Sequence, residues 1–151
     1  STLMRSSAAS DVYKRQMPAD AISMIRSSIE DENSDMAFYD NLIRKAPSQK
    51  EKMIIQGIRN DEEKHGQILR KIYYDFTKQN ISYQTPANYN FQSSSYRDDL
   101  EKALFSELAA VKKYRKILSV MSGDYYTLLM SIMTDENIHA AKYNFLLGNQ
   151  R

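Results

Sequence analysis

The sequence DEEKH at residues 61–65 recurs 74 positions later as DENIH at residues 135–139. Both histidines of the chain lie in these stretches, and each has Glu three positions and Asp four positions before it. In an α-helix, residues i and i+3 share one face, so the Glu and His side chains of each stretch can reach one metal cluster. Carboxylate and imidazole donors suit iron, manganese or zinc. The two stretches therefore predict a metal centre held between two helices.

The apolar residues around these stretches repeat with the period of an α-helix. Four helices are expected, at about residues 18–46, 48–78, 96–121 and 124–147. Pro47 separates the first two helices and the pair Ser122-Gly123 separates the last two. Residues 80–95 are polar, contain Pro86 and are expected to form a loop. The sequence therefore predicts an all-α fold.

The lengths of the connections predict the topology of these helices. The short connections make an antiparallel hairpin of the first two helices and another of the last two. The middle connection of about 16 residues reaches roughly 50 Å when extended. A helix of about 30 residues is roughly 45 Å long, so this loop can run the full length of the bundle. Two hairpins joined by one long crossover form a ferritin-like four-helix bundle.

Ionisable residues interrupt the apolar stripe of the other two helices as well. In the first helix, Glu32 stands where the stripe would have an apolar residue. In the third helix, Glu107 stands at such a position on a stripe with Leu104, Leu108 and Val111. With the two repeated stretches, four carboxylates and two imidazoles are expected in one core. Burying these groups unpaired is costly, and the carboxylates repel one another. Two divalent cations would balance the four negative charges.

The chain also repeats itself outside the histidine motifs. Glu32 and Tyr39 are seven positions apart, as are Glu107 and Tyr114, and the two pairs are offset by 75 residues. This offset is close to the one that relates the two histidine motifs. Two copies of one helix hairpin would build a near-symmetric site with one metal in each half.

The complete set of motifs resembles the ferritin-like di-iron carboxylate superfamily, and within it the rubrerythrin-like proteins, over roughly residues 18–147. The resemblance implies a pair of iron ions, with manganese or a mixed pair as alternatives. It implies no haem, because Glu63 stands where bacterioferritins have the haem-ligating Met. A rubredoxin domain is missing, since the chain has no cysteine.

The resemblance also implies a role for each motif residue. It places Glu32 with His65 on one metal and Glu107 with His139 on the other. Glu62 and Glu136 would bridge both metals as the catalytic carboxylates. Asp61 and Asp135 would accept hydrogen bonds from the ligand imidazoles, and Tyr39 and Tyr114 would lie close to the site.

Composition narrows the class of protein further. The 151 residues fit one domain, and the net charge of +2 from scattered basic residues gives no support for nucleic-acid or membrane binding. The absence of cysteine excludes disulfides, thiolate metal sites and cysteine nucleophiles. A cytoplasmic location is expected. Residues 1–16 are expected to be a disordered or non-native extension, and residues 17–151 to form the ferritin-like domain.

Three functions are compatible with these features. The first is an oxidoreductase that reacts with peroxide or O₂, as a rubrerythrin-like peroxidase or a ferroxidase. Its partners would be the small oxidant and an external electron donor, and a homodimer is expected. The second is iron or manganese storage without turnover. The third is a metal-free helical interaction module, which leaves the six ionisable core residues unexplained.

Overall fold

The computed structural model describes residues 18–82 and 94–150. This part of the chain contains four helices and no strand, as the sequence predicted. The helices are α2 (Ala19–Lys45), α3 (Gln49–Thr77), α4 (Tyr96–Leu118) and α5 (Gly123–Gly148). Residues 80–82 and 94–95 are not helical, in agreement with the expected loop. The expectations for residues 1–16 and for the centre of the loop lie outside the described residues.

Local sequence signals explain where the helices begin and end. The Ser48 hydroxyl accepts a hydrogen bond from the Glu51 backbone N–H at 3.2 Å and caps the start of α3. Lys78 ends the same helix in the left-handed conformation, with φ of 59°. Helix α4 ends at Leu118, three residues before the expected Met121. The reversal into α5 takes up the intervening residues, and α5 begins directly at Gly123 with φ of +63°.

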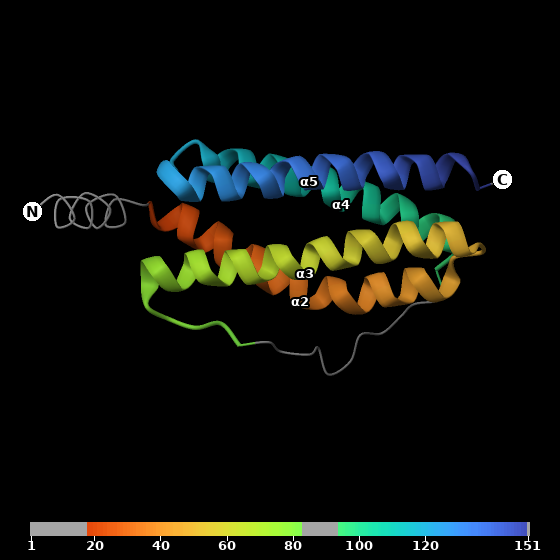
Figure 1. The fold of residues 1–151 in the computed structure, drawn as a ribbon, viewed down its shortest axis with the longest axis horizontal. Helices are drawn as coiled ribbons and strands as arrows, with labels where there is room; N and C mark the ends of the chain where they lie inside the picture. Colours follow the sequence, from red (N-terminus) through yellow and green to blue (C-terminus); the bar gives the residue numbers. More distant parts are fainter. Residues whose placement is uncertain (1–17, 83–93, 151) are drawn as a thin grey trace, which may run out of the picture.

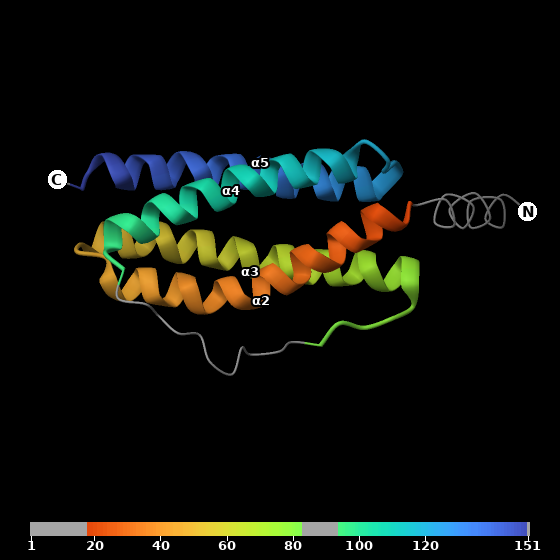
Figure 2. The same ribbon diagram turned by 180° about the vertical axis from the view of Figure 1, so that it is seen from behind.

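The four helices form two antiparallel hairpins, α2 with α3 and α4 with α5 (Figure 1). Helices α3 and α5 lie on one face of the bundle, and Figure 2 shows α2 and α4 on the opposite face. Helix α3 ends at the opposite end of the bundle from the start of α4, so the connection between the hairpins must run along its length. This is the ferritin-like topology that the loop lengths predicted.

The core consists of two apolar clusters separated by a polar layer. One cluster contains Ile25, Ile29, Leu69, Ile72, Tyr73, Tyr114, Ile117, Leu118, Leu129 and Ile132. The other contains Phe38, Tyr39, Leu42, Ala46, Ile55, Ile58, Leu100, Ala103, Tyr143 and Leu146. Leu108, which was expected on the core stripe of α4, is instead 39% exposed. The buried stripe passes through Ala103 and Glu107, and Leu108 lies one residue beyond it, rotated by about 100° around the helix.

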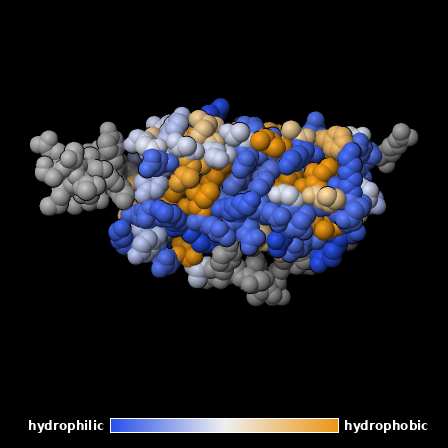
Figure 3. All heavy atoms as spheres, viewed as in Figure 1, coloured by the Kyte–Doolittle hydropathy of each residue, from blue (hydrophilic) through white to orange (hydrophobic). Residues whose placement is uncertain are grey.

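The surface of the described helices carries both hydrophilic and apolar areas. No helix within the described ranges is long and apolar enough to cross a membrane. Figure 3 shows the face formed by α3 and α5, where a hydrophilic band separates two apolar patches.

Candidate metal centre

All six predicted ligands lie in the polar layer between the two apolar clusters. They are Glu32, Glu62, His65, Glu107, Glu136 and His139, and none is more than 7% exposed. Each helix contributes its candidate ligands from its middle, where these residues interrupt the apolar stripe. Helices α2 and α4 supply one Glu each, and α3 and α5 supply one Glu and one His each. The structure therefore brings together the whole set that the sequence singled out.

Four of these residues form a compact group. One ligand atom from each of Glu62, Glu107, Glu136 and His139 lies within 4.8 Å of the others. His139 Nδ1 is 2.9 Å from Glu62 Oε1, and His65 Nδ1 is 3.1 Å from Glu136 Oε1. Each imidazole thus faces the carboxylate of the opposite histidine motif. Glu62 lies near both histidines, because its Oε2 atom is also 3.6 Å from His65 Nδ1.

An aspartate fixes the outer nitrogen of each imidazole. His65 Nε2 lies 2.8 Å from Asp135 Oδ2, and His139 Nε2 lies 3.1 Å from Asp61 Oδ2. Each aspartate therefore holds the histidine of the other helix, which the sequence alone did not decide. An aspartate at Nε2 favours the proton on that nitrogen and leaves Nδ1 to act as a ligand inside the site.

Four buried ligand atoms of this layer meet in two pairs. His139 Nδ1 faces Glu62 Oε1 at 2.9 Å, and His65 Nδ1 faces Glu136 Oε1 at 3.1 Å. With neutral imidazoles each pair brings two acceptor atoms together, so a proton or a metal ion must lie between them. Oxygen and imidazole lone pairs facing one space are the donor set of a divalent transition metal. The residues present therefore fit bound metal ions.

The electrostatics of the six ionisable groups point to the same conclusion. Burial, together with nearby Glu62, raises the pKa of Glu32 to about 9. Burial also opposes ionisation of Glu62, but the two imidazoles outweigh it and lower the pKa of Glu62 to about 2. Burial disfavours charged imidazoles, yet the carboxylates outweigh it and raise the pKa of His65 to about 11 and of His139 to about 10. Imidazolium protons therefore occupy the place of the metal charge, and a bound metal must displace them.

Both predicted tyrosines lie beside the site. The Tyr39 hydroxyl donates a hydrogen bond to Glu107 Oε1 at 3.4 Å. Tyr114 is 4% exposed and interacts electrostatically with Glu136 and Glu32. Burial raises the pKa of both phenols well above 10, so both keep their protons near the carboxylates.

Two further residues belong to the site but were missed in the sequence. Burial and the nearby Glu62 raise the pKa of Asp35 to about 7, and Asp35 also interacts with Glu107. Asp35 lies three residues after Glu32 on α2, and residues with this spacing share one face of a helix. The spacing could therefore have identified Asp35 in the sequence. Arg70 has its Nε and Nη1 atoms buried and interacts electrostatically with Glu32. In the sequence Arg70 is one of many charged helical residues, so only packing identifies it.

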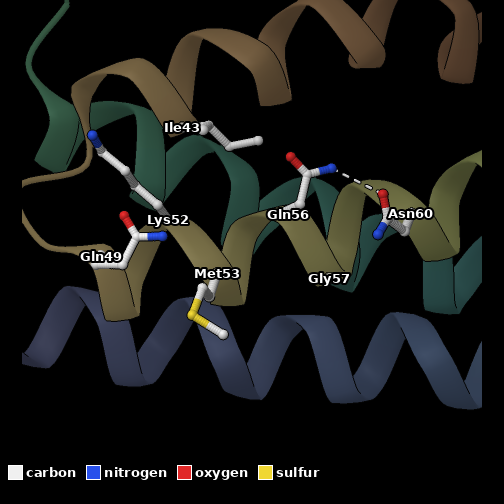
Figure 4. Close-up of a pocket in the computed structure, with 7 residues that line it drawn as sticks. All are labelled: Ile43, Gln49, Lys52, Met53, Gln56, Gly57 and Asn60. Atoms are coloured by element: carbon white, nitrogen blue, oxygen red, sulfur yellow. Dashed lines mark hydrogen bonds between the residues drawn. The ribbon is translucent and has the colours of Figure 1, made fainter.

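A surface cavity of 410 Å³ lies apart from this polar layer. Figure 4 shows its lining residues Ile43, Gln49, Lys52, Met53, Gln56, Gly57 and Asn60. Gln56 Nε2 donates a hydrogen bond to Asn60 Oδ1 at 2.9 Å, so the two amides partly satisfy each other. The lining contains no carboxylate and no imidazole, so it lacks the ligand set of the polar layer.

Comparisons with known proteins show the fold and the family of the chain. A hypothetical protein from Pyrococcus furiosus has a similar structure, with a TM-score of 0.70, 19% sequence identity and coverage of 90% of this chain and 93% of that chain. At this identity the likeness shows the fold alone. No curated protein matches the sequence. The sequence profile of the rubrerythrin family matches residues 23–147, which include all six candidate ligands. The chain therefore belongs to the rubrerythrin family.

Proposed function

We propose that this protein is a non-haem di-iron oxidoreductase that reduces hydrogen peroxide, with oxidation of ferrous iron by O₂ as the closest alternative. The observation that carries the proposal is the buried layer of four carboxylates and two imidazoles, in which imidazole nitrogens face carboxylate oxygens at 2.9 Å and 3.1 Å. Membership of the rubrerythrin family supports it. The same ligands also accept manganese. The choice of iron as the bound metal is therefore itself part of what we propose.

In this proposal Glu32 and His65 would hold one ion, and Glu107 and His139 would hold the other. Glu62 and Glu136 would contribute their carboxylates to both ions, since each faces an imidazole of the opposite histidine motif. An iron pair, when bound, supplies two electrons to the oxidant. The chain has no cysteine with which to bind a second iron site, so an external donor must return the electrons.

The protein residues around the ligands would prepare the site for this chemistry. Asp61 and Asp135 orient the two imidazoles. The apolar clusters above and below the layer keep bulk water away from it. Tyr39 keeps its proton and donates a hydrogen bond to Glu107 Oε1 at 3.4 Å, so it would orient this carboxylate.

Metal analysis of purified protein tests the site. The wild-type chain is expected to hold about two ions, and the Glu62→Ala/Glu136→Ala variant close to none. A matched control, Glu30→Ala/Glu63→Ala, also removes two glutamates from the same bundle, but both are exposed. Equal metal content in the wild type and the Glu62/Glu136 variant would show that the site is wrongly assigned.

Consumption of oxidant by the reduced protein then tests the reaction. Rapid peroxide consumption with slow O₂ consumption is expected. Fast oxidation of ferrous iron by O₂ would favour a ferroxidase. Tight metal binding without turnover of either oxidant would favour storage and contradict the proposed activity.

A further inference from the structure

Tyr143 on α5 carries a buried hydroxyl group that the packing of the helices does not explain. The side chain is fully buried, with 0% exposure, and its hydroxyl has no hydrogen-bond partner among the described residues. Leaving a buried polar group unpaired is unfavourable, and phenylalanine would fill nearly the same space without this disadvantage. The phenol of Tyr143 therefore requires an explanation other than core packing.

The position of Tyr143 directs its hydroxyl toward the polar layer. Tyr143 follows His139 by four residues, so the two side chains lie on one face of α5. Helical side chains lean toward the N-terminus of their helix, and from Tyr143 this direction leads to His139 and Glu136. Tyr39 lies in the same apolar cluster as Tyr143, and its hydroxyl reaches Glu107 Oε1 at 3.4 Å. The two phenols thus approach the layer from the same side.

The electrostatic neighbours of Tyr143 agree with this direction. Burial raises the pKa of Tyr143 well above its usual value of 10, and Glu107 and Glu62 raise it further. Burial and the same two carboxylates also raise the pKa of Tyr39, which interacts with Tyr143 as well. The phenol of Tyr143 therefore keeps its proton close to the candidate ligands and remains a hydrogen-bond donor.

The opposite side of the layer has no phenol at the position that matches Tyr143. The residue 74 positions before Tyr143, at the offset that relates the two histidines, is Leu69 in the other apolar cluster. Tyr114 lies on this opposite side, but its hydroxyl interacts with Ser28. The unpaired donor of Tyr143 thus distinguishes one side of a site whose ligand motifs repeat.

We propose that Tyr143 donates a hydrogen bond to a small ligand that binds at the metal centre from the side of Tyr39 and Tyr143. The ligand needs an acceptor atom, and hydrogen peroxide is the one that the proposed reaction provides. This inference rests on the proposed function, because it requires the metal centre. Tyr143 is then a ligand-binding residue, whereas the carboxylates and imidazoles hold the metals.

Azide, a small anion with acceptor nitrogens, is the probe for this hydrogen bond. Azide is titrated into the iron-loaded full-length protein and followed by absorption. Tyr143→Phe is expected to raise the dissociation constant of azide by about 10-fold or more, since a hydrogen bond to a charged group is lost. The matched control is Tyr73→Phe, at a phenol that is 5% exposed in the other apolar cluster, and it should change nothing. Equal azide affinities in Tyr143→Phe and the wild type would overturn the proposal.

The metal-free form of the same variant separates ligand binding from a structural role. Tyr143→Phe removes a hydroxyl without a partner, so the Tm of the metal-free protein is expected to stay the same or to rise by a few degrees. The iron content of the loaded variant should equal that of the wild type. A lower Tm or a loss of iron would assign the hydroxyl to the fold or to the metal ligands and would overturn its role in ligand binding.

The infrared stretch of bound azide identifies the donor directly. Transfer to D₂O is expected to shift this stretch in the wild type and to shift it less in Tyr143→Phe. Equal shifts in both proteins would show that another exchangeable group, such as water, is the donor. Wild-type protein that holds iron but binds no azide would overturn the role of Tyr143 and leave the metal centre intact. Wild-type protein that holds no iron would overturn the metal centre itself.

Discussion

Asp61 and Asp135 show how single residues link the two halves of the bundle. Each lies on one helix and holds the histidine of the other at 3.1 Å or 2.8 Å. The aspartates are about one third exposed, whereas the histidines are buried. Each pair therefore connects a buried ligand to the surface between α3 and α5 and fixes the relative position of these helices.

The aspartates should matter for metal affinity more than for folding. Asp61→Asn keeps the shape of the side chain but removes the charge that holds the His139 imidazole, and metal affinity is expected to fall by about 10–100-fold. Competition with a chelator measures this. Asp40→Asn, at an exposed aspartate on α2, is the control and should have no effect. Equal affinities in the two variants would show that the Asp61 contact does not support the ligand.

A side chain at Gly66 would displace the ends of two other side chains. A Cβ atom there would meet Glu32 Oε2 and Arg70 Nη1, which must shift, so Gly66→Ala is expected to lose the stability that alanine otherwise adds to a helix. Gly57 lies on the same helix, and a Cβ atom added there would have no neighbouring atom within 4 Å. Gly57→Ala should therefore stabilise the protein by about 0.5–1 kcal/mol through helix propensity. Urea denaturation compares the two, and a stabilising Gly66→Ala would contradict the close approach.

At the scale of elements, the helices follow their local sequence signals closely. Four helices were expected from the apolar period, and their observed ends differ by at most a few residues. The two errors, the end of α4 and the exposure of Leu108, both arise on α4. Its apolar residues cover more than one face, so periodicity alone did not separate the buried stripe from its exposed neighbour.

Two serines at helix starts give a test of capping. Ser48 caps α3 through its hydroxyl, whereas Ser122 precedes α5 without a side-chain hydrogen bond. Ser48→Ala is expected to cost about 0.5–2 kcal/mol of stability because an N–H at the start of α3 loses its partner. Ser122→Ala should change stability by less than about 0.5 kcal/mol. The same urea assay measures both, and equal costs would disprove the capping role.

At the scale of the whole molecule, a charged layer divides the core. Two apolar clusters flank it, so the bundle is stabilised on both sides of a layer that is unfavourable without metal. This arrangement makes the stability of the metal-free protein depend on the protons that its buried groups hold.

The metal-free protein should lose stability as the pH rises. The pKa of His65 is about 11 and that of His139 about 10, above the ordinary 6.5, so their contribution is complete below pH 6.5 and is lost through pH 10–11. Glu32, whose pKa is raised from 4.5 to about 9, loses its contribution as the pH rises from 4.5 through 9. Glu62 acts oppositely, but only below pH 4.5.

Thermal unfolding of the stripped protein measures this dependence. The Tm is expected to fall between about pH 6 and pH 9. Metal binding should strengthen over the same interval, because the ligands must lose protons to bind. A Tm of the stripped protein that rises with pH would contradict the protonation of the buried layer.

We propose that the protein forms a homodimer through the face of α3 and α5. Met53 is 66% exposed on α3, and Phe145 and Ile138 are 48% and 46% exposed on α5. Light scattering is expected to give the mass of two chains, and Met53→Glu/Phe145→Glu to give one. Phe105→Glu, at an exposed phenylalanine on α4, is the control and should stay dimeric. A monomeric wild type would rule out the dimer.

The sequence by itself determined the helices, their topology and the six candidate ligands. Helical spacing is local, so a Glu three residues before a His shares its face in any helix. Only the tertiary structure decided which aspartate holds which histidine, and that Arg70 and Asp35 lie close enough to the layer to interact with its carboxylates. These contacts join residues on different helices. Their geometry depends on how the helices pack, because side chains far apart in sequence meet only when the two hairpins come together.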